Sequence, residues 1–232
     1  DLLGYINFKL PIIEAIASSG FFSSSLVCKG CSAQSIGSNI GFLEAYLAAQ
    51  HDTSMRAYDI AWSYGCRSIH SSPMLINYFD GQHIPGGPKS VDGVLFLSIL
   101  HHAANHTSSL LRSANTVARK AILVLEDLEI PGDERLSARN RQHEPNGIFR
   151  TDTQWKRMFR THLTSFVLLG SDLVRQRAPS VRVPVKGGKP LGTSHLLMPS
   201  NNVVTLTPST GAIRNEAQRW WLLGRRSERP DS

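Results

Sequence analysis

The feature that most constrains the fold is a regular alternation of short apolar runs with helix-like segments between residues 30 and 130. Residues 94–97 are apolar at every position, which is typical of a strand covered on both faces of a sheet. Residues 121–125 have the same character, and the segment between the two runs carries apolar residues at helical spacing. Strands that alternate with helices in this way predict a parallel sheet with right-handed crossovers.

Further apolar runs extend this pattern in both directions. Residues 32–36, 55–60 and 74–79 predict three earlier strands, and a helix with Phe42, Leu43, Tyr46 and Leu47 on one face follows the first of them. A capping box over 151–154 predicts a late helix, and residues 166–169 and 203–206 predict two closing strands. We therefore predict an α/β fold with a doubly wound, mostly parallel, seven-stranded sheet.

The length of 232 residues and the 41% hydrophobic content fit a single α/β domain. We expect a helical lead-in over 1–29, a domain over 30–210 with a basic insertion at about 175–195, and a basic tail over 211–232. Residues 130–150 read as a charged, mobile loop. No run of about 18 apolar residues occurs, so we predict no membrane association through a spanning helix.

The cysteines bear on the compartment and on metal binding. Three of them, Cys28, Cys31 and Cys66, form no disulfide framework, and their odd number favours an intracellular, reducing compartment, without distinguishing cytoplasm from mitochondria. Cys28 and Cys31 form a CxxC, but no second ligand pair follows at the spacing that a zinc site needs. We predict no metal site, and the sequence carries no signal of oligomeric state.

The net charge of +7 is distributed unevenly. Residues 1–111 carry 5 Lys and Arg against 7 Asp and Glu, whereas residues 112–232 carry 20 against 11. Such an asymmetry predicts a polyanionic partner, RNA or a ribonucleoprotein, bound through the basic second half. The alternative is that these side chains only keep the surface soluble.

Glycines and acids recur at the ends of the predicted strands. The first strand runs into Ser35-Ile36-Gly37-Ser38-Asn39-Ile40-Gly41, the second ends at Asp59, the third is followed by Asp80-Gly81, and the fourth leads to Leu100-His101-His102. In this order and spacing the series resembles the class I S-adenosylmethionine-dependent methyltransferases. It is most similar to the small-substrate branch whose fourth strand is followed by Leu-His-His.

The residues explain why this pattern suits a nucleoside cofactor. Gly37 and Gly41 allow a tight turn with close backbone approach, and the helix that follows offers N–H groups to a carboxylate. Asp59 lies 22 residues after Gly37, where a carboxylate can accept both ribose hydroxyls. The resemblance implies that Asp80 binds the adenine amino group and that Gly81 lets the ring pack closely. The predicted S-adenosylmethionine site therefore comprises Ser35, Gly37, Ser38, Asn39, Gly41, Asp59, Asp80 and Gly81.

Three residues bear on whether the protein is catalytically active. Ser35 stands where the family usually has an acid that holds the methionine ammonium group. His101 and His102 follow the fourth strand, from which this fold presents groups to the transferred methyl, and one imidazole is a candidate general base. The alternative is that one histidine packs beneath the cofactor and the other caps the next helix. Asp92 is expected to be structural, and Glu126 and Asp127 to begin a loop.

Two functions follow from this reading. The first is an S-adenosylmethionine-dependent methyltransferase whose acceptor is unidentified, with RNA or an RNA-associated substrate as a candidate. The second is a catalytically degenerate, methyltransferase-like scaffold or assembly protein in a ribonucleoprotein, for example a mitochondrial ribosome precursor. Binding of the cofactor distinguishes them.

Overall fold

A computed structural model describes residues 12–13, 15–17, 19–60, 74–175, 190–199, 207–208 and 221–222. Its main sheet has the order β3-β2-β1-β4-β5-β7-β6, in which β3 to β5 are parallel and β7 and β6 run antiparallel to them. In chain order these strands are β1 (Ser32–Ile36), β2 (Ser54–Asp59), β3 (Ile76–Tyr78), β4 (Val91–Leu97), β5 (Ala118–Glu126), β6 (Phe166–Arg175) and β7 (Pro190–Pro199). The predicted α/β fold with a mostly parallel sheet is confirmed.

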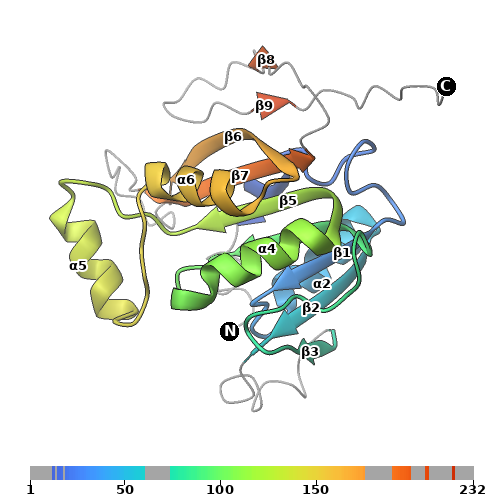
Figure 1. Cartoon of the computed structure of the whole chain (residues 1–232), viewed down its shortest axis with the longest axis horizontal. Helices are drawn as coiled ribbons and strands as arrows, with labels where there is room; N and C mark the ends of the chain where they lie inside the picture. Colours follow the sequence, from blue (N-terminus) through green and yellow to red (C-terminus); the bar gives the residue numbers. More distant parts are fainter. Residues whose placement is uncertain are drawn as a thin grey trace, which may run out of the picture.

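The sheet separates two apolar layers, because alternate residues of a strand point to opposite faces. Val94 and Phe96 of β4 pack with α4 (Thr107–Val117) and α6 (Asp152–His162) in one cluster. Leu95 and Leu97 pack with α2 (Phe42–His51) and the lead-in segment in the other. Figure 1 shows α4 and α6 in front of the sheet and α2 behind it. Every residue of β4 is buried, as the apolar run predicts.

Local sequence signals account for several element boundaries. Thr151 accepts a hydrogen bond from the Gln154 backbone N–H, and the Gln154 side chain accepts one from the Thr151 N–H, so the predicted capping box begins α6. The lead-in is helical over its described residues 12–13 and 15–17, and Gly20 ends it with φ 74°. A short 3₁₀ turn, η2 (Ala104–His106), leads into α4.

The structure corrects two expectations. Residues 130–150 contain a helix, α5 (Glu134–His143), which lies to one side of the sheet, at the left of Figure 1. The partner of β6 is β7, so residues 190–195, which the sequence assigned to a basic insertion, lie within the sheet. Residues 61–73, 176–189 and 203–206, where a helix, the rest of that insertion and a strand were expected, lie outside the described residues.

The lead-in packs under the sheet at Gly93. A Cβ at this position would lie 2.5 Å from Phe21 Cζ and 2.6 Å from Val27 Cγ2, so only glycine lets the segment approach β4 so closely. Directly after Val27 in the chain, Cys28 and Cys31 are joined by a disulfide, a pairing that the sequence did not predict. Lys120 Nζ lies 3.4 Å from the Cys31 sulfur.

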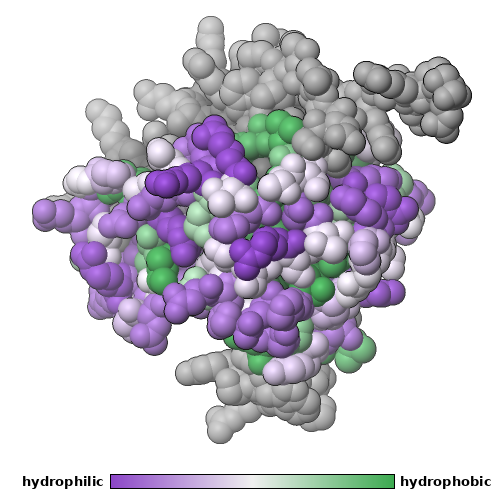
Figure 2. Space-filling model, viewed as in Figure 1, coloured by the Kyte–Doolittle hydropathy of each residue, from purple (hydrophilic) through white to green (hydrophobic). Residues whose placement is uncertain are grey.

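The described surface is mainly polar. The face shown in Figure 2 is largely hydrophilic, with separate small apolar areas. Within the described ranges, no helix combines the length and apolar character needed to cross a bilayer.

The short strands β8 (Thr207–Pro208) and β9 (Trp221–Leu222) pair with each other in a separate antiparallel ribbon. The domain limits inferred from the sequence stay predictions.

Candidate functional site

The loop after β1 has an unusual backbone. Gly37, Asn39 and Gly41 all have positive φ, at 76°, 52° and 73°. A Cβ on Gly37 would lie 2.3 Å from Ile99 Cγ1, so glycine is required there both by the φ angle and by the close approach of the segment that follows β4. The loop, which leads from β1 to α2, therefore packs against the segment that follows β4, at the carboxyl edge of the sheet.

Hydrogen bonds fasten the same loop to the end of β2. The backbone N–H groups of Gly37 and Ser38 donate to the Tyr58 carbonyl at 2.8 and 3.0 Å, and Ser38 Oγ donates to it at 3.0 Å. The Asn39 N–H donates to Asp59 Oδ2 at 2.7 Å. Asp59, predicted to bind ribose, thus lies directly beside the loop predicted to bind the rest of the cofactor.

Ser35 has an acidic neighbour that the sequence analysis missed. Its hydroxyl donates to Glu44 Oε1 at 2.8 Å, and both residues are buried. Glu44 occupies the first turn of α2, where a carboxylate also interacts favourably with the helix dipole. The predicted apolar face of this helix is therefore wrong in part, since Glu44 is buried and Tyr46 is 44% exposed. The site keeps a carboxylate next to the end of β1.

Asp80 organises the turn after β3. Its Oδ1 accepts the N–H groups of Gln82 and His83 at 2.8 and 2.7 Å, and its Oδ2 lies 2.7 Å from His83 Nδ1. The hydrogen bond to the His83 side chain and those to the two backbone N–H groups lower the pKa of Asp80 to about 2. Gly81 has φ 76°, and a Cβ there would lie 3.0 Å from Ile60 Cγ2. Asp80 therefore holds its own turn in addition to any contact with adenine.

His101 is enclosed by two carboxylates. The side chain is 1% exposed, its Nδ1 lies 2.7 Å from Glu126 Oε2, and its Nε2 lies 2.5 Å from Glu144 Oε2. Burial opposes the charged imidazolium, but the hydrogen bond and charge of Glu126 and the charge of Glu144 outweigh it and raise the pKa of His101 to about 9. In the absence of a bound cation, this histidine is therefore a positively charged imidazolium at neutral pH.

Glu126 holds the turn after β4 in place. Its Oε1 accepts the N–H groups of Ile99 and Leu100 at 2.9 and 2.6 Å, and its Oε2 accepts that of His101 at 3.4 Å. The carboxylate is completely buried. The sequence analysis assigned Glu126 to the start of a loop, whereas the structure makes it the anchor of the Leu-His-His segment. An acid at the end of a buried apolar strand was the available signal.

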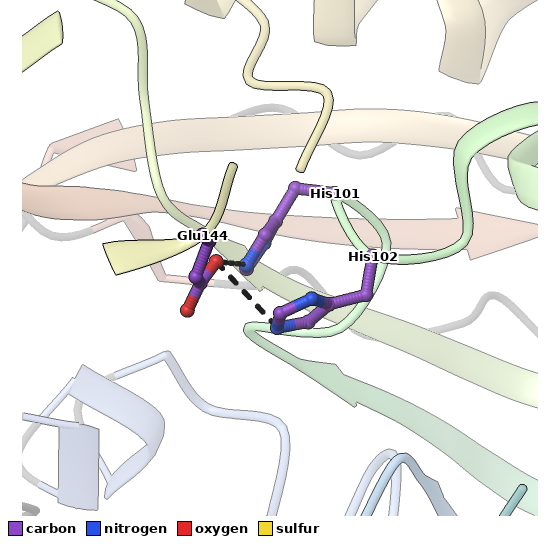
Figure 3. A group of neighbouring side chains, drawn as sticks. All are labelled: His101, His102 and Glu144. Carbon is purple, nitrogen blue, oxygen red and sulfur yellow. Dashed lines mark ion pairs between the residues drawn. The ribbon is translucent and has the colours of Figure 1, made fainter. Parts of the chain in front are cut away.

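His102 lies on the open side of this cluster. Its Nε2 is 3.5 Å from Glu144 Oε2, and its side chain is 47% exposed (Figure 3). Burial and the neighbouring charge of His101 lower its pKa, against the pull of Glu144, Glu126 and Asp59. The segment that carries Glu144 is tied down because the Ile148 N–H donates to the His101 carbonyl at 2.8 Å and the Phe149 ring stacks on His101.

The two histidines therefore differ. Neither caps the helix that follows, because the N-cap residues are Ala103 for η2 and His106 for α4. The structure connects both to the loop after β1 through Ile99, whose side chain contacts Gly37. Their catalytic role stays a prediction. His102 is the stronger candidate of the two, because its imidazole is substantially exposed.

Comparison with known proteins identifies the fold that carries this site. No protein-family model and no curated protein matches the sequence. Among solved structures, an S-adenosylmethionine-dependent methyltransferase from Methanosarcina mazei aligns with a TM-score of 0.60 and 13% identity over 82% of this chain and 97% of its own. The chain has the fold of the class I methyltransferases.

Further solved structures agree on the fold. Magnesium protoporphyrin IX methyltransferase from Synechocystis PCC 6803, solved with bound S-adenosylhomocysteine, aligns with a TM-score of 0.59 and 12% identity over 84% of this chain and 86% of its own. An S-adenosylmethionine-dependent methyltransferase from Aquifex aeolicus aligns with a TM-score of 0.55 and 12% identity over 83% and 92%. The predicted resemblance to class I methyltransferases is confirmed as a structural match.

The residues at the strand ends fit the cofactor of this fold. Gly37 leaves no side chain on a loop already packed against Ile99, and the Asn39 contact holds a carboxylate beside that loop. Glu44 provides a buried acid where Ser35 itself has none. The donor set thus includes acids for hydroxyl and ammonium groups and a helix N-terminus for a carboxylate.

Proposed function

We propose that the protein is an S-adenosylmethionine-dependent methyltransferase. The observation that carries the proposal is the loop of Gly37, Asn39 and Gly41, with three positive φ angles and a hydrogen bond from Asn39 to Asp59. A backbone bent in this way, beside an acid and ahead of a helix, is suited to a ligand that carries a carboxylate and a ribose. The fold match supports the same function.

Each strand end has a part in this proposal. The cofactor supplies an electrophilic methyl group on a sulfonium. Gly41 and the first turn of α2 receive the methionine carboxylate, Glu44 attracts the ammonium group, and Asp59 accepts the ribose hydroxyls. Asp80 and Gly81 border the adenine. The protein's contribution is mainly alignment and exclusion of water, so no dedicated base is required.

The acceptor enters, in this proposal, from the side of His102 and Glu144. These side chains are 47% and 34% exposed, whereas His101 is enclosed behind them. The excess of basic residues in 112–232 supports a polyanionic acceptor or partner, of which RNA is the candidate. The scaffold alternative drew on Ser35, on the long extensions and on the charge asymmetry, and the Glu44 carboxylate beside Ser35 removes the first of these three supports.

Calorimetric titration with S-adenosylhomocysteine tests the proposal. We expect saturable binding to the unmodified protein and a loss of about 1–3 kcal/mol in Asp59→Ala, because charged hydrogen bonds to ribose disappear. Asp52→Asn is the matched control, since Asp52 lies on the surface in an ion pair with Lys29. Absence of binding at millimolar ligand would reject the methyltransferase and favour the scaffold.

A further inference from the structure

The cluster of His101, His102 and Glu144 brings three metal-ligating side chains together. One ligand atom from each, the two Nε2 atoms and Glu144 Oε2, lies within 4.8 Å of the others. They come from two distant segments, the turn after β4 and the chain just beyond α5 (Figure 3). Two imidazole nitrogens with one carboxylate oxygen are a common ligand set for divalent transition metals.

One pair of atoms in the cluster indicates a missing ligand. His101 is completely buried, and within the described part of the chain neither its Nε2 nor Glu144 Oε2 has a hydrogen-bond partner of acceptable geometry, although they lie 2.5 Å apart. Buried polar atoms are rarely left in this state in native proteins. When a cation displaces the Nε2 proton of His101, two lone-pair atoms converge here, and one metal ion would serve as the partner of both.

The other side of His101 is prepared in the way metal-binding histidines usually are. Its Nδ1 lies 2.7 Å from Glu126 Oε2, so in the neutral imidazole that a metal ion requires, Nδ1–H donates to that carboxylate and the lone pair of Nε2 faces Glu144. Metal-ligating histidines commonly donate their second N–H to a carboxylate, which fixes the ring and increases its basicity. Glu126 is itself immobilised by three backbone N–H groups.

Charge and size also favour a divalent ion. Glu126 and Glu144 place two negative charges against one imidazole, and a divalent cation with neutral histidines would balance them. In tetrahedral coordination with bonds of about 2.0–2.1 Å, neighbouring ligand atoms lie about 3.3 Å apart. The distance of 3.5 Å from His102 Nε2 to Glu144 Oε2 already matches this value. Rotation of the partly exposed Glu144 would open its shorter contact with His101.

We propose that His101, His102 and Glu144 form a binding site for a divalent transition-metal cation such as Zn²⁺, with Glu126 as the residue that orients His101. Mg²⁺ is disfavoured because it prefers oxygen ligands. The exposed flank of His102 leaves a coordination position open to water or to an acceptor oxygen. The site is independent of cofactor binding, so either proposal can fail without the other.

Cobalt is the probe, because Co²⁺ bound to nitrogen and oxygen ligands has visible absorption bands that Zn²⁺ lacks. We expect the chelator-treated 232-residue chain to bind one equivalent of Co²⁺ and to lose the bands when Zn²⁺ is added. His102→Ala and Glu144→Gln should abolish the bands, and Glu126→Gln should weaken affinity about 10- to 100-fold. His106→Ala is the matched control, because this exposed histidine lies outside the cluster.

The substitutions at His102 and Glu144 involve partly exposed side chains, so both variants are expected to fold, and circular dichroism checks this. Bound Zn²⁺ should also raise the Tm of the unmodified protein but not of either variant. Absence of cobalt bands in the unmodified protein overturns the proposal, as do bands that persist in both folded variants. In either case the cluster would be an ion-pair network held by a proton on His101.

Discussion

The loop after β1 and the cluster around His101 lie at the same edge of the sheet but are built on different principles. The loop depends on backbone conformation, with positive φ angles at Gly37, Asn39 and Gly41 and donors that are mostly backbone N–H groups. The cluster depends on charged side chains that enclose His101, the buried Glu126 from β5 and the partly exposed Glu144 from the chain after α5. The first can be recognised in a short stretch of sequence, whereas the second exists only after distant segments have folded together.

Glu126→Ala should have the largest effect, because the cluster needs its central acid. The substitution leaves His101 and three backbone N–H groups without their buried acceptor. Breaking a buried charged pair by removing one partner costs about 3–5 kcal/mol. We expect a loss of this size in the free energy of unfolding measured with urea.

Glu134→Ala provides the comparison for this variant. Glu134 is an exposed acid in the first turn of α5, and its removal should change stability by less than about 0.5 kcal/mol. Equal effects of the two substitutions would mean that the cluster contributes no more than a surface charge does.

Gly37→Ala should have the next largest effect and tests whether the loop depends on its backbone. Alanine at φ 76° is strained by about 1–2 kcal/mol, and its Cβ would also overlap the Ile99 side chain. Overpacking of this kind adds about 1–3 kcal/mol. We expect reduced stability in urea unfolding and weakened binding of S-adenosylhomocysteine by calorimetry.

Gly132→Ala separates the two contributions. Gly132 has φ 83°, but nothing lies within 4 Å of a Cβ placed there. This variant should show the conformational strain alone and leave ligand binding unchanged. If Gly132→Ala destabilises as much as Gly37→Ala, the close approach of Ile99 to the loop has no energetic importance.

Glu44→Gln should have a smaller effect, confined to ligand affinity. Glutamine keeps a hydrogen-bond partner for Ser35 but removes the charge that we assign to the methionine ammonium group. Loss of one such charged contact corresponds to about tenfold weaker binding of S-adenosylhomocysteine, or about 1.4 kcal/mol. Calorimetry with 5′-methylthioadenosine, which lacks the amino-acid part, should show no change. Equal weakening for both ligands would place Glu44 outside the ammonium site.

The contrast between the two regions also explains what the sequence could predict. The run 94–97 and the glycines at 37 and 41 carry local signals, and both the buried strand and the bent loop were predicted from them. The role of Glu126 depends on a distance of 25 to 27 residues along the chain, so no spacing rule applies to it. Glu144 follows a helix rich in charged and polar residues, α5, whose weak apolar pattern resembled a loop. For the same reason no metal-ligating set was predicted.

Asp92 offers the smallest effect and a third case, a buried carboxylate at the opposite end of β4 whose cationic partners, Lys120 and Arg119, are partly exposed. Its carboxylate accepts hydrogen bonds from the Ser32 N–H and hydroxyl at 3.0 and 3.2 Å and lies 3.2 Å from Lys120 Nζ. Burial alone would raise the pKa of Asp92, but the Ser32 N–H, Lys120 and Arg119 outweigh it and hold the pKa below that of an ordinary aspartate. The ionised form is therefore the one that stabilises the fold.

The lowered pKa of Asp92 determines how its contribution to stability changes with pH. The stability that Asp92 contributes is fully present above the pKa of an unfolded aspartate and is lost as the pH falls through the lower pKa of the folded protein. Urea unfolding of the protein and of Asp92→Asn should differ by about 1 kcal/mol at neutral pH, and the difference should shrink as the pH falls below about 4. Because Lys120 and Arg119 are partly exposed, added salt should reduce it too. A difference as large as that of Glu126→Ala, or one that grows on acidification, would show that the partial exposure of the cationic partners does not set this contact apart from the enclosed His101 cluster.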